Sequence, residues 1–485
     1  MRAAAAVLIL GLLCQTASSG QQPAGSSAMA AIKAEGMNRS QAPRLFHQLT
    51  DVIGPRLSGS PGHVTAARWA AEQFKSWGLA NTRLEPFDFG RGWTLEKLTV
   101  EMTTPRYMPL LAYAEAWSPS TAGAVTGAPI YVGDLPAAEI DRLGTRLKGA
   151  IVLVSRPQTE FLRADRMDPS VGSPVKTGNP PYPEASTATP MPELLARLRM
   201  HGAGVVLRPG AMEHGTVRVQ GNRATAPDAV PTVVLGAEQY NLLVRLAQAG
   251  TPLQLRVEVG VRFAPGPDSY NVLAEIPGSD PALRDEVVFI GAHLDSWHTA
   301  TGATDNADGA VAVMEAMRIL TTLPARPRRT IRAALWSGEE QGMLGAYAHV
   351  AKNLRDDGSR GRISVYINDD PGSGATYGFY MQENEPAKRV FDSWLEPLRD
   401  IGVRRNVIEG IGSTDHLAFD DVGIPAFTVI KDFKNYDTRT RHTNADFADA
   451  VSDADLKQSA TVLAAVAWQA AALDAKIPRR IKAAK

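Results

Sequence analysis

Beyond residue 270 the chain alternates between short apolar runs and longer segments with the periodicity of amphipathic helices. The apolar runs predict strands at residues 271–276, 286–291, 330–336, 363–368 and 426–430. The other segments predict helices at residues 307–320, 342–353, 385–402 and 452–473. This alternation predicts an α/β fold with a mainly parallel, mixed sheet that is flanked by helices.

The N-terminal region is expected to complete this domain. Residues 20–38 are rich in Gln, Pro, Ala, Gly and Ser, and we expect a flexible lead there. Residues 40–79 have helical periodicity on either side of a turn-rich loop at residues 54–62. Strand-like runs follow between residues 82 and 103.

Residues 118–263 differ from the sequence on either side of them. Short apolar strands alternate with two predicted helices, and residues 158–192 are rich in Pro, Ser and Thr, which predicts an exposed excursion or lid. This block has no cluster of acidic residues and histidines. We therefore predict a smaller accessory domain of β-rich α+β type. It is inserted between residues 20–117, the N-terminal part of a catalytic domain, and residues 264–485, the main part.

The first 19 residues predict a signal peptide. Arg2 precedes an apolar run at residues 3–13 that is too short to span a bilayer, and residues 17–19 are small, as signal peptidase requires. Cys14, the only cysteine, lies in this segment, so the mature chain is expected to need no disulfide. Lipidation of Cys14 is the alternative, but Leu13 is larger than the residue that usually precedes a lipidated cysteine, which disfavours it. We expect an exported protein, periplasmic or secreted, without a membrane span.

Composition limits the classes of partner. The chain has 485 residues, of which 44% are apolar, and this length predicts more than one domain. It carries 51 basic and 51 acidic side chains, so its formal net charge is zero. Because a nucleic-acid-binding protein needs a basic face, we expect no nucleic-acid partner.

Acidic residues and histidines follow four of the predicted strands. After the strands that end at residues 291, 336, 368 and 430 come, in turn, His293 and Asp295, Glu339 and Glu340, Asp369 and Asp370, and His442. Asp305 is expected at the start of a helix, where the helix dipole favours a carboxylate, and Asp415 and His416 precede the last strand. Because the carboxyl ends of parallel strands meet at one edge of a sheet, we expect these side chains to form a single site.

The chemistry of such a set is that of a two-metal hydrolase. Two zinc ions can share one carboxylate and hold a bridging water as the nucleophile, with about three nitrogen or oxygen ligands for each ion. A further carboxylate must take the proton of the water and pass it to the leaving group. The adjacent Glu339 and Glu340 can divide the two jobs of base and ligand.

With these residues in view, the chain resembles the co-catalytic zinc exopeptidases related to aminopeptidase Y and plasma glutamate carboxypeptidase. The motifs that carry the resemblance are at residues 293–295, 305–306, 338–342, 370–372, 413–416 and 442–446. The resemblance implies that the inserted block is a protease-associated domain. It also implies two zinc ions, with His293 and Asp370 on one, Glu340 and His442 on the other, and Asp305 bridging them. In the same comparison Glu339 would be the general base and Asp295 would orient His293.

The sequence departs from the family pattern at Arg441, where relatives often have a tyrosine that steadies the tetrahedral intermediate. Arg441 could stabilise an oxyanion electrostatically, or Tyr436 could take that role. Asp369 competes with its neighbour Asp370 as a ligand, and the following Pro-Gly favours Asp370.

Four other residues near the motifs have open roles. Asp415 and His416 are expected to support the fold or a ligand rather than to bind metal. Trp297 is expected to pack or to line a substrate pocket, and His298 either contacts substrate or lies at the surface.

The resulting hypothesis is an exported metallopeptidase that hydrolyses a terminal peptide bond. Aminopeptidase action is the first expectation, and dipeptidase or carboxypeptidase action is the second. A glutaminyl cyclase with one zinc and a non-catalytic receptor-like relative are the rivals from other classes. The expected partner is a peptide or dipeptide substrate, and a homodimer is left open.

Overall fold

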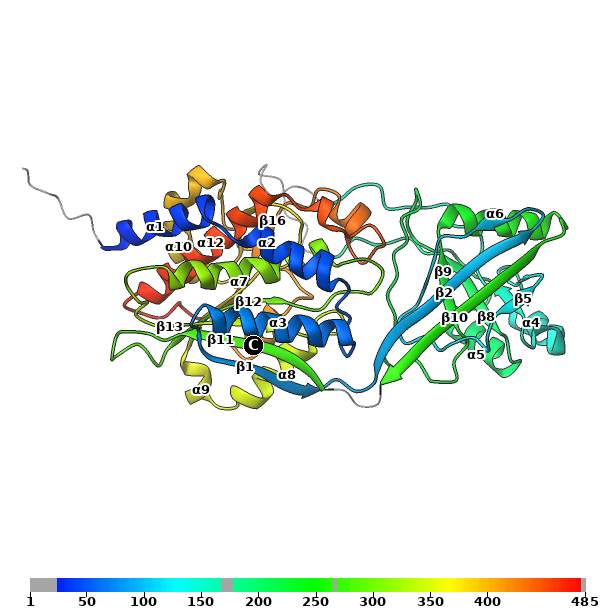
Figure 1. The fold of residues 1–485 in the computed structure, drawn as a ribbon, viewed down its shortest axis with the longest axis horizontal. Coiled ribbons are helices and arrows are strands. Elements are labelled where there is room, and N and C mark those ends of the chain that lie inside the picture. The colour runs from blue at the N-terminus through cyan, green and yellow to red at the C-terminus, as the bar shows by residue number, and fades with distance from the viewer. Residues whose placement is uncertain (1–23, 167–177, 265–267, 481–485) are drawn as a thin grey trace, which may run out of the picture.

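The computed structural model describes residues 24–166, 178–264 and 268–480, which form two lobes along one long axis (Figure 1). The first lobe contains a sheet of seven strands, and the second contains sheets of four and five strands. The signal-peptide prediction for residues 1–19, with Cys14, lies outside the described residues. None of the helices in the described residues is long and apolar enough to cross a membrane.

The seven-stranded sheet is the framework of the first lobe. Its strands, in spatial order, are β1 (Ala80–Asp88), β11 (Asp268–Ile276), β13 (Thr330–Trp336), β12 (Val287–His293), β14 (Ile363–Asn368), β16 (Ala426–Lys431) and β15 (Thr376–Tyr380). The central four strands β13, β12, β14 and β16 run parallel, while β1, β11 and β15 are antiparallel to their neighbours. The predicted mixed α/β architecture is confirmed.

Helices cover both faces of this sheet (Figure 1). The larger core contains residues of α1 (Ala24–Asn38), α2 (Ala42–His47), α3 (Pro61–Ser76), α7 (Asp308–Thr321), α10 (Glu385–Ser393) and α12 (Asp453–Ala472). The core on the opposite face contains residues of α8 (Leu344–Asn353) and α11 (His416–Asp420). The shorter elements of this lobe are η1 (Gln48–Ile53), η4 (Ala303–Ala307), α9 (Asp357–Gly361), η5 (Glu396–Ile401), η6 (Tyr436–Thr440) and η7 (Ala448–Ala450).

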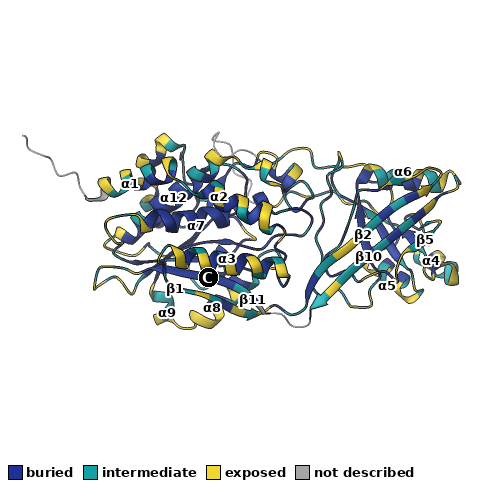
Figure 2. Cartoon of the chain, viewed as in Figure 1, coloured by how far each residue is buried: buried dark blue, intermediate teal, exposed yellow. Residues whose placement is uncertain are grey.

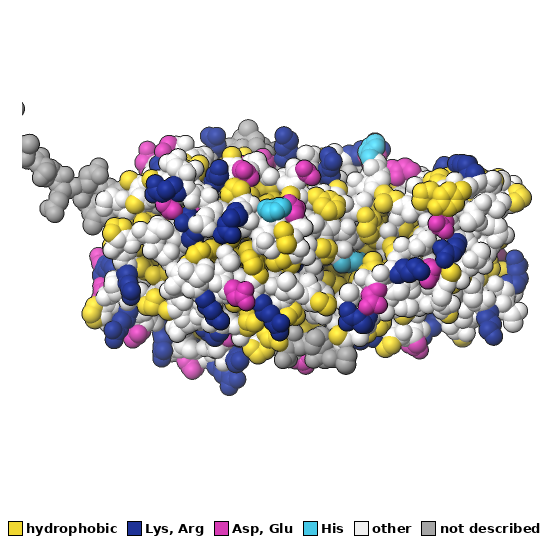
Figure 3. All heavy atoms as spheres, viewed as in Figure 1, with side chains coloured by type: hydrophobic (Ala, Val, Ile, Leu, Met, Phe, Trp, Pro, Cys, Tyr) yellow, Lys and Arg dark blue, Asp and Glu magenta, His cyan; other side chains and the backbone are white. Residues whose placement is uncertain are grey.

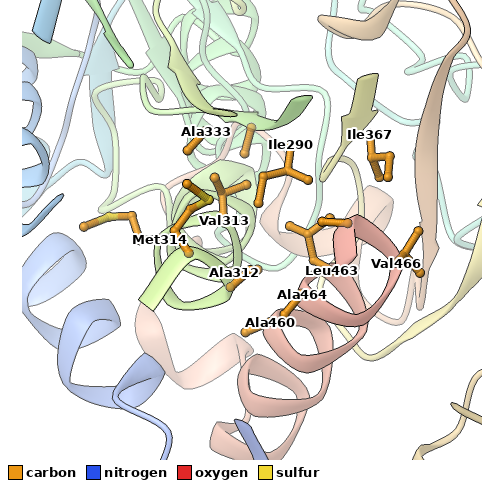
Figure 4. Close-up of a cluster of buried hydrophobic side chains, with 14 of the residues drawn as sticks. Ile290, Ala312, Val313, Met314, Ala333, Ile367, Ala460, Leu463, Ala464 and Val466 are labelled. Atoms are coloured by element: carbon orange, nitrogen blue, oxygen red, sulfur yellow. The ribbon is translucent and has the colours of Figure 1, made fainter. Parts of the chain in front are cut away.

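The central strand β12 is buried along its whole length, and its side chains alternate between the two cores. Val288 and Ile290 contribute to the larger core, whereas Val287 and Phe289 contribute to the opposite one. Figure 4 shows Ile290 facing Val313 of α7 and the helix α12. A strand that is buried on both faces has a continuous apolar run, which is why the sequence alone located it.

Two predictions about helices were wrong. Residues 385–402 do not form one helix, because Pro397 cannot donate a backbone hydrogen bond, and α10 is followed there by the separate turn η5. The flexible lead predicted at residues 20–38 is wrong for its described part, because α1 occupies residues 24–38 and buries Ile32. At Gly36 a Cβ would lie 2.1 Å from Oγ1 of Thr461 in α12, so the glycine permits the close approach of the two helices.

The second lobe is built on a long antiparallel ribbon of β2 (Gly92–Thr104) and β10 (Gln254–Ala264) (Figure 1). With β3 (Met108–Pro109) and β5 (Val125–Gly127) this ribbon forms the four-stranded sheet. The five-stranded sheet has the order β4 (Ala112–Ala114), β9 (Thr232–Leu235), β8 (Val205–Pro209), β7 (Ile151–Leu153) and β6 (Ile130–Tyr131). Its helical elements are α4 (Ala137–Leu143), η2 (Gly144–Leu147), α5 (Met191–Met200) and α6 (Ala237–Gln248).

Residues 92–117 lie in the second lobe, although the predicted boundary at residue 118 assigns them to the catalytic domain. The strand β2 belongs to the second lobe because it pairs with β10 along eleven residues, and β4 belongs there because it pairs with β9.

Figure 2 shows buried residues in both lobes, and Figure 3 shows basic and acidic side chains interspersed on the visible surface.

The docking of α1 depends on a buried ion-pair group. Arg318 of α7 donates to Glu35 of α1 at 2.8 Å and to Glu315 at 2.7 Å, and Glu315 is fully buried. Arg318→Met leaves the buried carboxylate of Glu315 without a cation and leaves Glu35 with Arg39 alone. We expect it to lower the free energy of unfolding by about 3–5 kcal/mol, as measured by urea denaturation.

Lys33→Met is the matched control for Arg318→Met. Lys33 also lies on α1, but its ion-pair partner Asp400 is 64% exposed. We expect a loss of at most about 1 kcal/mol. Equal destabilisation by the two substitutions would contradict the buried docking of α1.

Candidate metal centre

The parallel strands bring the predicted side chains to one edge of the sheet. β12 ends at His293, while β13 and β14 end shortly before Glu340 and Asp370. β16 is followed by the turn η6 and then by His442. Because β12, β13, β14 and β16 run in one direction, the four side chains arrive at the same carboxyl edge.

Two groups of three side chains could each hold a metal ion, and Asp305 belongs to both. The groups are His293, Asp305 and Asp370, and Asp305, Glu340 and His442, with the ligand atoms of each group within 4.8 Å of one another. Oδ1 of Asp305 lies 3.2 Å from Nε2 of His293, and Oδ2 lies 3.1 Å from Nε2 of His442. The carboxylate thus turns one oxygen toward each histidine, as a bridging ligand would.

The spacing of these atoms fits zinc. Ligands about 2.0–2.1 Å from a tetrahedral zinc lie about 3.3 Å from one another. Nε2 of His442 is 3.0 Å from Oε2 of Glu340, and Nε2 of His293 is 3.9 Å from Oδ1 of Asp370. Among the described residues, Nε2 of His293 and Oε1 of Glu340 are buried without an aligned hydrogen-bond partner. Buried carboxylates and unsatisfied ligand atoms call for a cation, so the donor set fits two zinc ions.

The turn η4 carries Asp305. The sequence predicts Asp305 at the first turn of a helix, but α7 begins only at Asp308, and Asp305 has non-helical angles of φ −138° and ψ 83°. Asn306 explains the difference, because its side chain donates to the backbone oxygen of Asp369 at 2.8 Å and accepts from the amide of Gly309 at 3.1 Å. These bonds tie the turn to β14 and aim the carboxylate at the site.

Neighbouring groups orient the ligands. Nδ1 of His293 lies 3.0 Å from the backbone oxygen of Asp295, so a proton on Nδ1 leaves Nε2 free for a metal. The Asp295 carboxylate accepts from the amides of Glu339 at 3.3 Å and Glu340 at 3.4 Å, and thereby holds the loop that presents both side chains. Trp297 donates from Nε1 to Oε2 of Glu340 at 2.7 Å.

Charge coupling within the site is strong. Burial by itself would lower the pKa of His293, but the surrounding carboxylates, with Glu339 first, raise it well above its usual value. Burial by itself would raise the pKa of Asp305, but hydrogen bonds with His293 and His442 hold it well below the usual range. The carboxylates thus favour a positive charge at His293, and the positive charge there favours the ionised form of Asp305.

Glu339 lies beside the ligands but belongs to neither group. Its Oε2 is 4.0 Å from Nε2 of His293, and burial raises the pKa of its carboxyl well above the usual value. A carboxylate that is close to the site and is not needed as a ligand can accept and release a proton.

The other sequence candidates lie around the groups. Asp369 is directed away from them, because Lys431 holds it at 2.6 Å together with Asp308 at 2.9 Å. Asp415 is fully buried, and neither of its carboxylate oxygens has a hydrogen-bond partner among the described residues. His416 is paired through Nε2 with the backbone oxygen of Ile411 at 3.1 Å.

Comparison with known proteins agrees with this geometry. Residues 271–467, which include all five candidate ligands, match the model of peptidase family M28. Over these residues the chain is similar to peptidase family M28. It is 26% identical to carboxypeptidase Q of Bos taurus over 89% of this chain and 85% of that protein. The predicted assignment to the zinc-dependent metallo-exopeptidases is confirmed at the level of the family.

Solved structures of similar fold cover nearly the whole chain. A peptidase M28 precursor from Shewanella amazonensis SB2B superposes with a TM-score of 0.71 at 22% identity, over 94% of this chain and 99% of that one. A zinc aminopeptidase from Bacillus subtilis superposes with a TM-score of 0.61 at 20% identity, over 92% of this chain and 98% of that one. These similarities extend the likeness of fold to the second lobe.

A cavity of about 240 Å³ opens beside the candidate ligands. Its catalytic-lobe wall includes Glu339, Tyr436 and Arg441, and its other wall includes Gln220 and Arg166 from the second lobe. Tyr436 is buried, with 1% of its surface exposed. The pocket next to the metal centre is thus enclosed by both lobes.

The segment at residues 158–192 is not simply an exposed excursion, as the sequence predicted. Arg166 is buried and donates to both carboxylate oxygens of Asp437, at 2.8 and 2.9 Å. The Tyr182 hydroxyl donates to the backbone oxygen of the same residue at 3.0 Å. The described part of this segment therefore holds η6, which carries Tyr436 and leads to His442.

A second set of contacts from the second lobe reaches His442, one of the candidate metal ligands. Nη2 of Arg218 lies 3.1 Å from Nδ1 of His442, and the amide of Val219 donates to the backbone oxygen of His442 at 3.0 Å. Sequence reasoning missed Arg218 and Arg166, because neither lies near a metal-binding motif. His298, by contrast, is not among the residues that line the cavity, and its Nε2 lies 2.8 Å from the backbone oxygen of Ala114.

His442→Ala tests the second group of ligands. We expect the protein to lose about one zinc ion per chain, because Asp305 and Glu340 alone leave that site with two side-chain ligands. Metal content after dialysis, measured by atomic emission, gives the result. His47→Ala is the control, since His47 is 66% exposed and remote from the site. Unchanged metal content in His442→Ala would contradict the assignment.

Proposed function

We propose that this chain is an exported exopeptidase with two zinc ions, which removes the N-terminal residue of short peptides. The observation that carries the proposal is the position of Asp305, whose two carboxylate oxygens face His293 and His442. His293, Asp305 and Asp370 would hold one ion, and Asp305, Glu340 and His442 the other. Export rests on the signal-peptide pattern of residues 1–19.

The residues of the chain divide the work of hydrolysis. When bound, the two zinc ions would polarise the scissile carbonyl and acidify the attacking water. Glu339 accepts the proton of that water and delivers it to the nitrogen of the leaving amine. Asp295 keeps Glu339 in reach by accepting its backbone amide at 3.3 Å. Arg441 or Tyr436, both in the cavity wall, would face the developing negative charge.

The cavity supports action at the end of a chain. Its volume of about 240 Å³ lies below the roughly 300–1,000 Å³ of pockets that enclose drug-sized ligands. Walls from both lobes leave room for only a few residues beside the ligands. An internal bond of a folded protein could not enter such a site.

Carboxypeptidase or dipeptidase action is the second candidate. A specific observation favours it: the curated relatives that match along 89% of the chain include carboxypeptidase Q from Bos taurus and Mus musculus. The accessory domain would contribute to this choice of terminus, because Gln220 and Arg166 line the cavity. We propose, from the resemblance, that it is a protease-associated domain.

The two rivals from other classes have less support. A glutaminyl cyclase with one zinc would need only one of the two ligand groups, whereas this chain brings both together. A receptor-like relative without activity would not need Glu339 beside them. A measured content of one zinc per chain would favour the cyclase.

Glu339→Gln tests the base. We expect it to keep both zinc ions and to lower kcat by at least about 100-fold, because the amide cannot accept a proton. Initial rates on a short peptide and metal content of the same sample give the two readouts. Full activity would refute the assignment of Glu339, and hydrolysis that survives complete chelation of zinc would refute the metal mechanism.

Peptides with blocked ends decide between the two terminal specificities. One tripeptide is offered with both ends free, with an acetylated amine, with an amidated carboxylate and with both blocks. We expect acetylation to abolish cleavage if the aminopeptidase proposal is right, as followed by chromatography of the products. Cleavage of the acetylated peptide at its last bond would establish the carboxypeptidase candidate instead.

A further inference from the structure

Arg56 is a fully buried arginine in the turn-rich loop at residues 54–62. A guanidinium inside a protein usually pairs with a carboxylate, because an unpaired buried charge is costly. Here four donors of the guanidinium go to backbone oxygens instead. The acceptors are the oxygens of Leu294, Gly54, Thr301 and Gly302, at 2.8, 2.9, 2.6 and 2.9 Å in turn.

Three of these oxygens belong to the segment at residues 294–302, which connects two candidate metal ligands. The segment follows His293, the last residue of β12, and precedes η4, which carries Asp305. Nε of Arg56 binds the first residue of the segment, whereas Nη1 and Nη2 bind its last two residues. Because the guanidinium is planar and its nitrogens are at fixed separations, it sets the distance between the two ends of the segment.

The backbone of Arg56 binds the middle of the same segment. Its amide donates to Oγ of Ser296 at 3.1 Å, and its carbonyl oxygen accepts from the amide of Ser296 at 3.3 Å. The next residue, Trp297, donates to Glu340 at 2.7 Å. A Cβ on Gly302 would lie 2.3 Å from that of Ser296, so the end of the segment lies against its middle. One residue thus fixes the segment at its start, its middle and its end.

The loop that carries Arg56 also holds the segment before Glu339. Ser58 is fully buried, and its Oγ accepts from the amide of Gly338 at 2.8 Å and lies 3.0 Å from Oγ of Ser337. Neither group of candidate ligands includes a residue of this loop. The loop nevertheless contacts both of the segments that present His293, Asp305 and Glu340.

Carboxylates of the metal centre balance the charge of Arg56. Burial lowers the pKa of Arg56 to about 10, and the carboxylates of Asp446, Asp295 and Asp305 oppose this shift. The guanidinium therefore keeps its proton at neutral pH and can donate all of these hydrogen bonds.

We propose that Arg56 is a positioning residue of the metal centre, which holds His293 and Asp305 at the spacing that one zinc ion requires. Nε2 of His293 and Oδ1 of Asp305 are 3.2 Å apart. Arg56 does not line the cavity, so it acts through the segment at residues 294–302 and not on the substrate. The inference rests on the proposed two-zinc function and adds a residue outside the ligand set that determines how tightly zinc is held.

Zinc affinity of Arg56 variants tests the inference. Arg56→Lys keeps the charge, but one ammonium nitrogen cannot replace three nitrogens at fixed separations. We expect it to raise the Kd for the zinc ion at His293 about 10-fold, and Arg56→Met to raise it about 100-fold, the range for residues that orient metal ligands. The Kd is measured by competition with a chromophoric chelator on the metal-depleted full chain, after circular dichroism has shown that each variant is folded.

Arg329→Met is the matched control. Arg329 is also buried, and it donates to Glu286 at 2.8 Å and to the backbone oxygens of Leu473 and Asp474. It directly precedes β13, so it lies at the edge of the sheet opposite to the metal centre. We expect it to destabilise the fold and to leave the Kd for zinc unchanged. An equal rise of the Kd in Arg329→Met and Arg56→Met would overturn the inference, because it would be a general effect of losing a buried arginine.

A spectrum reports the geometry of the ligands directly. Co²⁺ is bound in place of zinc, and its visible absorption depends on the arrangement of the ligands. We expect the absorption bands to change in Arg56→Lys and to remain as they are in Arg329→Met. Identical spectra of Arg56→Lys and the unmodified protein, together with equal Kd values, would overturn the positioning role.

Ser296→Ala is a milder variant that decides the question if neither Arg56 variant folds. It removes the hydrogen bond from the Arg56 amide to Oγ and leaves the guanidinium in place. We expect the Kd for zinc to rise about 3-fold, as for the loss of one hydrogen bond. An unchanged Kd would count against the inference.

The zinc titration also separates this inference from the proposed function, because it does not depend on hydrolysis. Weaker zinc binding by the Arg56 variants supports the positioning role even if the unmodified protein cleaves no peptide. Unchanged zinc binding in these variants, together with peptide hydrolysis by the unmodified protein, would overturn the role of Arg56 and leave the peptidase function standing. Absence of zinc binding by the unmodified protein would overturn both.

Discussion

The shared carboxylate of Asp305 is the constraint around which the first lobe is arranged. Its two oxygens lie 3.2 Å from His293 and 3.1 Å from His442, although these histidines are 149 positions apart in the sequence. Such a position requires the end of β12, the turn η4 and the loop after η6 to meet at one point. The parallel sheet makes the meeting possible, because it brings the carboxyl ends of β12, β13, β14 and β16 to one edge.

Burial makes this arrangement dependent on positive charge. Several carboxylates lie together where water is largely excluded, and each would be costly there without a cation. The chain balances the outer ones itself, since Lys431 pairs with Asp369 and Asp308. Asp305, Glu340 and Asp370 lie beside His293 and His442 instead, and in the proposed enzyme zinc would balance their charge. The division explains why Asp369 and Asp370, although adjacent, have different surroundings.

The second lobe takes part in the site rather than only flanking it. Arg166 fastens η6 through Asp437, and Val219 holds the backbone of His442. His442 has a positive φ of 58°, a conformation that a non-glycine residue keeps only when its surroundings enforce it. The lobe that carries no metal ligand therefore positions one, and it also closes the cavity in which the peptide would lie.

The sequence determined most of the first lobe and the identity of the candidate side chains. Runs such as residues 363–368 are apolar throughout because the strand is buried on both faces, and the order of strands and helices predicts a common edge. Tertiary structure alone decided the packing of α1, which Gly36 permits because it has no side chain, and the contacts of Arg166 and Arg218. The physical reason is the distance along the sequence between the residues that interact. Burial and strand periodicity involve neighbouring residues and therefore leave a local pattern of apolar positions. The partner of a charge 224 or 271 positions away leaves no such pattern, because only folding brings the two side chains together.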